Sequence, residues 1–409
     1  EEIIARDSYG GDAQEQDYVK ALSQHEVAQT LYQVSILHKM HIRSLLWTAE
    51  GVVIHGRQKF SGRAGHGRIL LFMVYCLKIN YSSREVQMYQ ELTLSNGARI
   101  LLERVAGARS AALGFFVGAG SRHESAVENG AAHFIEHMLF KGTARRSAAQ
   151  LARDMDAIGG QVNAYTTKEH TCFYARSLDR HLDQALDILS DMLFHSRFAQ
   201  KDVEMERSVI LEEIGMYEDA PDDLVSERLA AAVYKGSPLA RPILGTQSTL
   251  APMTGAWLDQ WRREHYRPGV LVAALAGSFT DSQVDKLKDC LSALEPGVAP
   301  VQKPAAYRPA VTARKKAIEQ NHLILAFPSP TYLDPRRRQL QLLNALLGGG
   351  CSSRLFQEVR EKRGLCYTVY SYVADHQDTG LLGIYTAVGK EQERQALDTV
   401  RDVVERLLQ

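Results

Sequence analysis

Three side chains that could bind and use a metal ion stand within five consecutive residues. His133, Glu136 and His137 form the pattern H-x-x-E-H. Residues three and four positions apart lie on one face of an α-helix, so these side chains would point the same way. Two neutral imidazoles at this spacing can share one zinc ion, and the carboxylate can accept a proton from zinc-bound water. The pattern indicates metal-assisted hydrolysis, although an amphipathic surface helix with two histidines would also contain it.

A zinc ion held by two histidines still needs a third protein ligand beside its water. An acidic segment predicted to be helical, 202–217, offers several carboxylates. Glu206 and Glu213 lie two turns apart on one face of this helix, so one could bind the metal while the other supports a ligand from behind. The spacing does not choose between them, and an acidic helix that faces solvent would look the same.

Composition excludes some classes of partner. The chain has 409 residues, enough for two or three domains with sizeable cores. Its 48 basic and 48 acidic residues cancel, which gives no electrostatic reason to expect nucleic acid or a membrane as a partner. The cysteines form no C-x-x-C pair, which is typical of reduced thiols and predicts a cytoplasmic protein. They are Cys76, Cys172, Cys290, Cys351 and Cys366.

The longest apolar run, 69–77, is nine residues and too short to span a bilayer. It lies too far from the start of the chain for a convincing signal peptide. We interpret it as a buried strand. The surrounding residues 1–87 lack sustained periodicity, and we treat them as an N-terminal extension of unknown role.

From Met88 onward, strand and helix patterns alternate. Two apolar runs, 89–94 and 98–105, flank the turn Ser95-Asn96-Gly97 and predict a β-hairpin. The helix with the two histidines is predicted to end near Gly142, a favourable C-cap. Further predicted strands are 111–117, 162–177 and 270–276, and further predicted helices are 148–158, 181–196, 202–217, 281–293 and one that begins at Trp257.

The pattern then repeats. A segment with four prolines, 295–310, is predicted to be a linker. After it come elements in a similar order. The predicted strands are 322–327, 367–375 and 381–388, and the predicted helices are 336–347, 354–362 and 391–408. This likeness predicts an α+β protein of two homologous α/β-sandwich units, 88–294 and 311–409. The second unit is shorter and the chain begins at Glu1, so we expect a fragment with an incomplete second unit.

These motifs resemble a known family. His133-Phe-Ile-Glu-His-Met-Leu-Phe-Lys-Gly-Thr143, followed by Glu206-Arg-Ser-Val-Ile-Leu-Glu-Glu213, resembles the pitrilysin/insulinase family of zinc peptidases, the inverzincins. The likeness is greatest to the branch of the mitochondrial processing peptidase β-subunit and its bacterial relatives, and it runs from Met88 to the end. In that family the third zinc ligand falls at Glu213, and Glu206 matches an accessory glutamate of the active site.

The resemblance assigns four more residues. Asn163 and Ala164 match the edge strand that binds the substrate main chain, a form of β-augmentation. In the second unit, Arg360 and Tyr367 match an arginine and a tyrosine that the family brings to the catalytic site. Arg360 would hold a substrate carbonyl, and Tyr367 would donate a hydrogen bond to the developing oxyanion.

The resemblance thus implies a zinc metalloendopeptidase that cuts unfolded peptides or protein segments. Zn²⁺ would be held by His133, His137 and Glu213, with Glu136 as the general base. A homodimer, or a heterodimer with a homologous subunit, is expected, and activity should depend on closure between the units. Two alternatives are a catalytically silent structural or assembly subunit of the same family and a peptide-binding protein. The intact set of ligands and base argues against the silent subunit.

Overall fold

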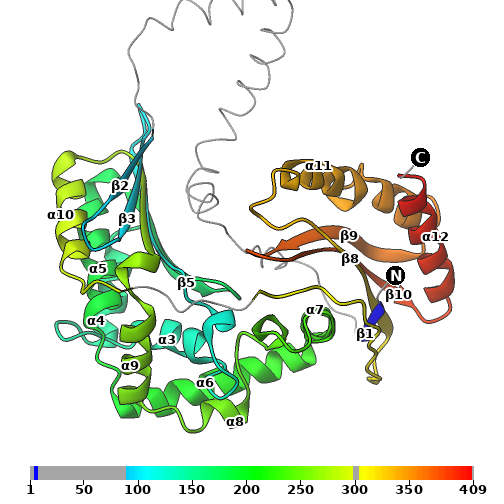
Figure 1. Ribbon diagram of the computed structural model, residues 1–409, viewed down its shortest axis with the longest axis horizontal. Helices are drawn as coiled ribbons and strands as arrows, with labels where there is room; N and C mark the ends of the chain where they lie inside the picture. Colours follow the sequence, from blue (N-terminus) through cyan, green and yellow to red (C-terminus); the bar gives the residue numbers. More distant parts are fainter. Residues whose placement is uncertain (1–3, 8–88, 298–303, 408–409) are drawn as a thin grey trace, which may run out of the picture.

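The computed structural model of the protein describes residues 4–7, 89–297 and 304–407. Within these residues, two β-sheets lie side by side, each with its own helices (Figure 1). The larger sheet is built from residues 90–277, and the smaller one mainly from residues 320–389. This arrangement confirms the predicted α+β fold with two units. The strand predicted at 69–77 lies outside the described residues.

The first sheet has six strands in the order β2-β3-β7-β4-β6-β5. β3 and β7 run parallel, whereas the other neighbours are antiparallel. The alternation predicted over 162–177 proves to be two strands, because the polar residues 167–170 form a turn closed by Thr167 N donating to His170 O at 2.8 Å. β5 pairs only with β6 in the described chain, so it forms an edge. The strands are β2 (Gln90–Thr93), β3 (Arg99–Arg104), β4 (Ser110–Val117), β5 (Gln161–Thr166), β6 (Thr171–Leu178) and β7 (Leu271–Gly277).

Helices cover one face of this sheet and share its main hydrophobic core. Phe115 and Phe173 from the sheet meet Phe134 and Ile135 from the helix with the two histidines, all at most 1% exposed. The helices of this unit are α3 (Ala131–Leu139), α4 (Ala148–Ala157), α5 (Leu182–His195), α6 (Gln200–Asp219), α8 (Gln247–Leu250), α9 (Gly255–His265) and α10 (Asp281–Ser292), with short helices η1 (Ser121–His123), η2 (Asp179–His181), η3 (Pro238–Ala240) and η4 (Pro268–Val270). None of the helices in the described ranges is long and apolar enough to cross a membrane.

The second sheet repeats part of the first. Its order is β1-β8-β10-β9, so β8, β10 and β9 correspond to β4, β6 and β5 in both order and chain direction. A helix follows the last strand of each set, as the sequence likeness predicted. The elements are β1 (Ile4–Asp7), β8 (Gln320–Pro328), β9 (Cys366–Asp375), β10 (Gly380–Gly389), α11 (Arg337–Gly348), α12 (Glu393–Glu405) and the π-helix η5 (Phe356–Glu361), which occupies most of a segment predicted to be an ordinary helix.

One helix that was not predicted from the sequence joins the two units. α7 (Pro221–Val233) follows α6 after the single residue Ala220, and Pro221 fits the first turn, where an N–H is not required. Val225 and Leu229 of α7 are buried in one cluster with Ile324 and Tyr385 of the second sheet. The chain that leaves α6 is therefore anchored on the other unit.

A buried ion network also crosses between the units. Arg122 is 3% exposed and donates to both Glu169 of the first unit and Asp378 of the β9–β10 turn. Glu169 also accepts from Gln377 N at 3.2 Å, and Asp378 accepts from Ala305 N at 2.7 Å. Since each charge has a partner, burial of the network leaves none of these carboxylates uncompensated.

We expect Glu169→Gln to reduce the loss of stability in acid. Burial opposes ionisation of Glu169, but His376 and Arg122 outweigh it and hold the pKa of this carboxyl below its ordinary value of 4.5. A lowered folded-state pKa stabilises the protein above the unfolded pKa, and this stabilisation is lost as pH falls through the folded pKa. When the free energy of unfolding is measured between pH 7 and pH 3, it should therefore fall less steeply below about pH 4.5 in the variant than in the wild type. Glu204→Gln, on the exposed face of α6, is the control; equal acid sensitivity of both variants would contradict the assignment.

We expect Leu229→Ala to lower the free energy of unfolding by about 2–5 kcal/mol, since it removes a side chain that is 1% exposed between α7 and the second sheet. Denaturant titration measures the change. Leu333→Ala is the matched control, because Leu333 is 73% exposed and should change stability by less than about 0.5 kcal/mol. Similar losses in the two variants would show that α7 does not anchor the units.

Candidate functional site

The start of helix α3 and its apolar face are fixed by contacts that do not involve the candidate metal ligands. Its N-cap, Gly130, has φ +98°, and an added Cβ would lie 2.8 Å from the carbonyl oxygen of Leu244. The Glu124 carboxyl accepts hydrogen bonds from Gly130 N at 2.9 Å and Ala132 N at 2.8 Å, which satisfies two donors at the start of the helix. The buried apolar face of α3 then orients the opposite face toward α6.

Helix α6 brings one carboxylate to the two histidines. Val203, Glu206 and Ile210 are the buried residues of α6, and Glu213 continues the same spacing of three and four residues. Glu213 Oε2 lies 3.6 Å from His133 Nε2 and 3.5 Å from His137 Nε2. The structure thus brings the three predicted ligands together, with one ligand atom from each within 4.8 Å of the others.

These distances fit a shared zinc ion. Zinc–nitrogen and zinc–oxygen bonds of about 2.0–2.2 Å in tetrahedral geometry place neighbouring ligand atoms about 3.3–3.6 Å apart. Burial lowers the pKa of His133 to about 4, so this imidazole is neutral at pH 7 and its lone pair is free to coordinate. Burial opposes ionisation of Glu213, but the two histidines outweigh it and lower its pKa. A neutral imidazole beside an ionised carboxylate is a donor set that zinc accepts.

Glu206 lies behind His137. Its Oε2 is 3.2 Å from His137 Nδ1, the ring nitrogen that faces away from Glu213. Its Oε1 is 2.6 Å from Lys141 Nζ, which balances a carboxylate that is only 3% exposed. Such a partner fixes the tautomer and orientation of a ligand histidine. Lys141 was not predicted from the sequence, although its position four residues after His137 places it on the same face of the helix.

Glu136 occupies the same surface of α3 but does not share the ligand triangle. Its Oε2 accepts a hydrogen bond from Thr166 Oγ1 at 2.5 Å. Burial raises the pKa of Glu136 to about 7, while Thr166 acts in the opposite direction. A carboxylate whose pKa lies near the working pH is suited to accept and return a proton. Thr166 is a second contact that the sequence did not reveal, because it depends on β5 reaching α3.

Negative charge gathers around this site. Burial raises the pKa of Tyr217 to about 12, and the nearby charges of Asp223, Glu213, Glu227 and Glu136 act in the same direction. A cation placed among these groups would lower their mutual repulsion. The electrostatics of the site therefore favour metal binding, as the donor distances do.

The proposed substrate strand lies at the sheet edge. Asn163 and Ala164 stand in the middle of β5, opposite Tyr174 and Phe173 of β6. Asn163 is exposed, and its Oδ1 accepts from Ala164 N at 2.9 Å. The free side of β5 can pair with an extended chain through backbone groups, and β5 packs against the metal-site helix α3.

Arg360 and Tyr367 contact each other and are not joined to the metal triangle by a hydrogen bond or ion pair between described residues. Arg360 Nη1 donates to Tyr367 O at 2.7 Å, and its guanidinium lies 4.5 Å from the centre of the Tyr367 ring. Tyr367 is 69% exposed. Arg360 belongs to the π-helix η5, a distortion often found at functional sites.

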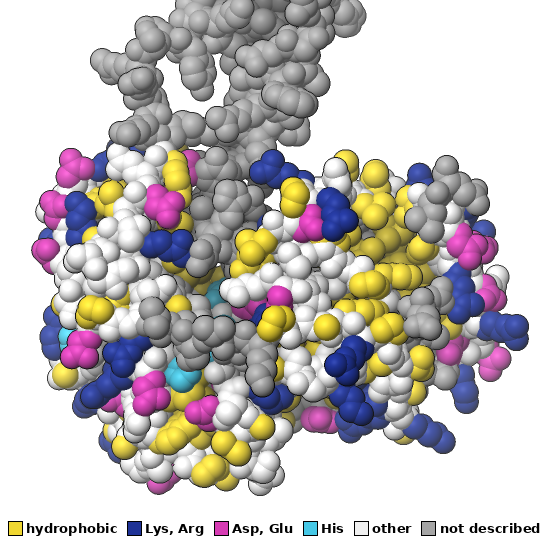
Figure 2. All heavy atoms as spheres, viewed as in Figure 1, with side chains coloured by type: hydrophobic (Ala, Val, Ile, Leu, Met, Phe, Trp, Pro, Cys, Tyr) yellow, Lys and Arg dark blue, Asp and Glu magenta, His cyan; other side chains and the backbone are white. Residues whose placement is uncertain are grey.

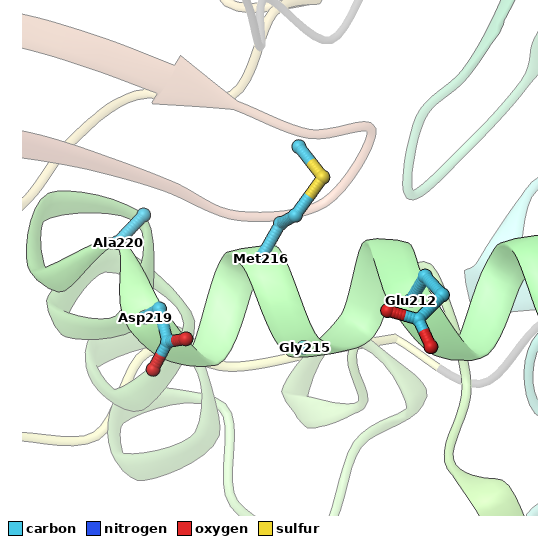
Figure 3. Close-up of a pocket in the computed structure, with 5 residues that line it drawn as sticks. All are labelled: Glu212, Gly215, Met216, Asp219 and Ala220. Carbon is cyan, nitrogen blue, oxygen red and sulfur yellow. The ribbon is translucent and has the colours of Figure 1, made fainter.

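A hollow on α6 adjoins the site along the helix. It is lined by Glu212, Gly215, Met216, Asp219 and Ala220 (Figure 3). Glu212 precedes the candidate ligand Glu213, but none of the predicted site residues lines the hollow. The residues that could bind metal are therefore held in the contact between α3 and α6 rather than in this depression.

We expect Glu206→Gln to weaken zinc binding by about 10–100-fold, because the charged partner of His137 is lost while the shape is kept. Competition with a chromogenic chelator measures the affinity. Glu204→Gln, two residues away on the exposed face of α6, should leave affinity unchanged. Equal affinities for the wild type and Glu206→Gln would contradict the supporting role of Glu206.

The chain matches two known family models. Residues 99–247 match the family described as Insulinase (Peptidase family M16), and residues 253–409 match a domain described as Peptidase M16 inactive domain. The three candidate ligands and Glu136 all fall in the first match. The second match begins before β7, although β7 completes the first sheet.

The chain is also similar to whole proteins. It is 45% identical over 319 residues to an uncharacterized zinc protease of Bacillus subtilis, covering 78% of each chain. It is 42% identical over 323 residues to an uncharacterized zinc protease of Streptomyces coelicolor, covering 76% of this chain and 70% of the relative.

Two solved structures share the fold. A peptidase M16 inactive domain from Pseudomonas fluorescens superimposes with a TM-score of 0.74 and 26% identity, covering 78% of this chain and 79% of that one. A protease from Helicobacter pylori gives a TM-score of 0.70 at 20% identity, covering 76% and 78%. From the matched families and the identity to its relatives, the chain belongs to the insulinase family of peptidases, Peptidase family M16.

Proposed function

We propose that this protein is a zinc-dependent endopeptidase that cuts unfolded peptides or protein segments. The observation that carries the proposal is the triangle formed by His133, His137 and Glu213, in which the carboxylate lies 3.5–3.6 Å from both imidazole nitrogens, the spacing of two ligands on one tetrahedral ion. Relatives named zinc proteases support the choice of metal. When bound, zinc would polarise the scissile carbonyl and lower the pKa of a coordinated water.

The chain's own residues would carry the proton transfers. Glu136 would accept a proton from the attacking water and pass it to the leaving amine, a role that suits its raised pKa. Glu206 would keep the His137 ring oriented, and Lys141 would balance the charge of Glu206.

The substrate would bind in extended form along β5. Main-chain groups at Asn163 and Ala164 would add the peptide as a further strand, which selects for unfolded segments and gives loose sequence selectivity. Closure of the second unit would then bring Arg360 and Tyr367 toward the scissile bond, where they would stabilise the developing oxyanion. The exposed ring of Tyr367 is accessible to such a substrate.

A partner subunit is part of the proposal. α11 exposes Leu342, Leu343 and Leu346, and Figure 2 shows yellow apolar side chains gathered on the unit that contains this helix. Exposed apolar groups of this kind favour association with another protein chain. A second copy or a homologous subunit, as first expected from the sequence, would cover them.

We expect Glu136→Gln to lower peptide hydrolysis by at least about 100-fold while leaving zinc bound, since it removes the base but keeps all three ligands. The measurement pairs cleavage of a quenched unstructured peptide, with and without chelator, with the zinc content of the protein. Glu204→Gln should retain both hydrolysis and zinc.

The two rival functions give different results. Zinc bound without hydrolysis in the wild type, with tight binding of the same peptide, would favour a peptide-binding protein. Absence of both zinc and hydrolysis would favour the silent subunit. Undiminished hydrolysis in Glu136→Gln would show that Glu136 is not the base.

A further inference from the structure

A threonine at the end of the edge strand touches the proposed base. Thr166 is the last residue of β5, and its hydroxyl donates to Glu136 Oε2 at 2.5 Å. Glu136 Oε1 makes no hydrogen bond to any residue in the described part of the chain. One carboxylate oxygen is thus held by the protein, while the other remains available to a proton donor.

The backbone that holds Thr166 is firmly bound. The following turn, 167–170, accepts hydrogen bonds at Thr167 O from Ser121 N (3.2 Å) and at Lys168 O from Arg122 N (2.7 Å). Gly120 packs so closely on this turn that an added Cβ would lie 2.4 Å from Thr167 O. The backbone that positions the Thr166 hydroxyl is therefore held on one side by pairing with β6 and on the other by the η1 segment.

The neighbouring hydrogen bonds leave the Thr166 hydroxyl one acceptor, the Glu136 carboxylate. Thr171, which pairs with Thr166 across β5 and β6, donates its own hydroxyl proton to Ala119 O at 2.9 Å. The oxygens of Thr166 and Thr171 are 3.4 Å apart, much farther than Thr166 Oγ1 is from Glu136 Oε2. A hydroxyl has a single proton to donate, so Thr166 donates its hydrogen bond to Glu136.

We propose that Thr166 is a positioning residue, whose hydroxyl fixes the Glu136 carboxylate and links it to the strand that binds substrate. This inference rests on the proposed function, because it assumes that Glu136 is the base. Thr166 itself exchanges no proton with substrate. It holds Oε2 so that Oε1 faces the attacking water, and it keeps the base in register with a peptide bound along β5.

The simpler alternative is that Thr166 only stabilises the strand end. Thr→Val substitution separates the two roles, because valine keeps the β-branched shape and removes the donor. A lost strand contact would weaken peptide binding and raise KM. A misplaced base would lower kcat with KM little changed.

The test compares Thr166→Val and Thr166→Ser with the wild type. Thr166→Val should lower kcat by about 10–100-fold, the scale expected when a reacting group is displaced by about 1 Å. KM should stay within about twofold, and Thr166→Ser, which keeps the hydroxyl, should recover most of kcat. Zinc content should remain that of the wild type, since no ligand is changed.

The matched control is Thr399→Val on α12. Thr399 is 6% exposed, and among the described residues its hydroxyl bonds only the helix carbonyl of Gln395, so the variant loses a buried hydroxyl away from the site. It should retain wild-type kcat. A crystal structure of Thr166→Val provides a readout apart from activity and should show the Glu136 carboxylate in a changed or multiple orientation.

The outcomes distinguish failure of this inference from failure of the proposed function. If Glu136→Gln is inactive but Thr166→Val keeps wild-type kcat and an unmoved Glu136, the positioning role is wrong and the peptidase function stands. A rise in KM alone would assign Thr166 to the strand and also overturn the inference. If Glu136→Gln retains hydrolysis, the proposed base is wrong, and the positioning role falls with it.

Discussion

The packing of α3 against α6 is the contact on which the rest of the site depends. It places one carboxylate 3.5–3.6 Å from two imidazoles and leaves Glu206 directly behind one of them. The hydrophobic core under α3 fixes the helix, and burial keeps His133 neutral at pH 7. Desolvation that would be costly for isolated charges is here offset by mutual pairing, and a bound cation would offset it further.

The same helix couples the site to the second unit. α6 ends at Asp219, and Pro221 starts α7, whose apolar side chains are buried on the other sheet. A movement of the second unit would thus act through α7 on α6, the helix that contains Glu213. The buried network around Arg122 connects the same units next to the turn that follows Thr166. β5, Glu136 and the second unit are thus connected through neighbouring backbone segments.

Much of this could be predicted from the sequence, for identifiable reasons. The H-x-x-E-H spacing predicts one helix face, and strand and turn patterns predict most elements of both sheets. Choosing Glu213 over Glu206 needed the family resemblance, since helical periodicity places both on one face. Thr166, Lys141 and the network of Arg122 were missed because they are tertiary contacts that no local period encodes. α7 was missed because its apolar face is explained only by a sheet about a hundred residues later in the chain.

The most direct test of the account is anomalous diffraction at the zinc absorption edge from crystals of the protein grown with zinc. We expect one peak within about 2.0–2.2 Å of His133 Nε2, His137 Nε2 and a carboxylate oxygen of Glu213. Glu206 should lie outside the coordination shell, with its carboxylate on His137 Nδ1. Zinc bound elsewhere, or Glu206 in place of Glu213 as the ligand, would contradict the site described above.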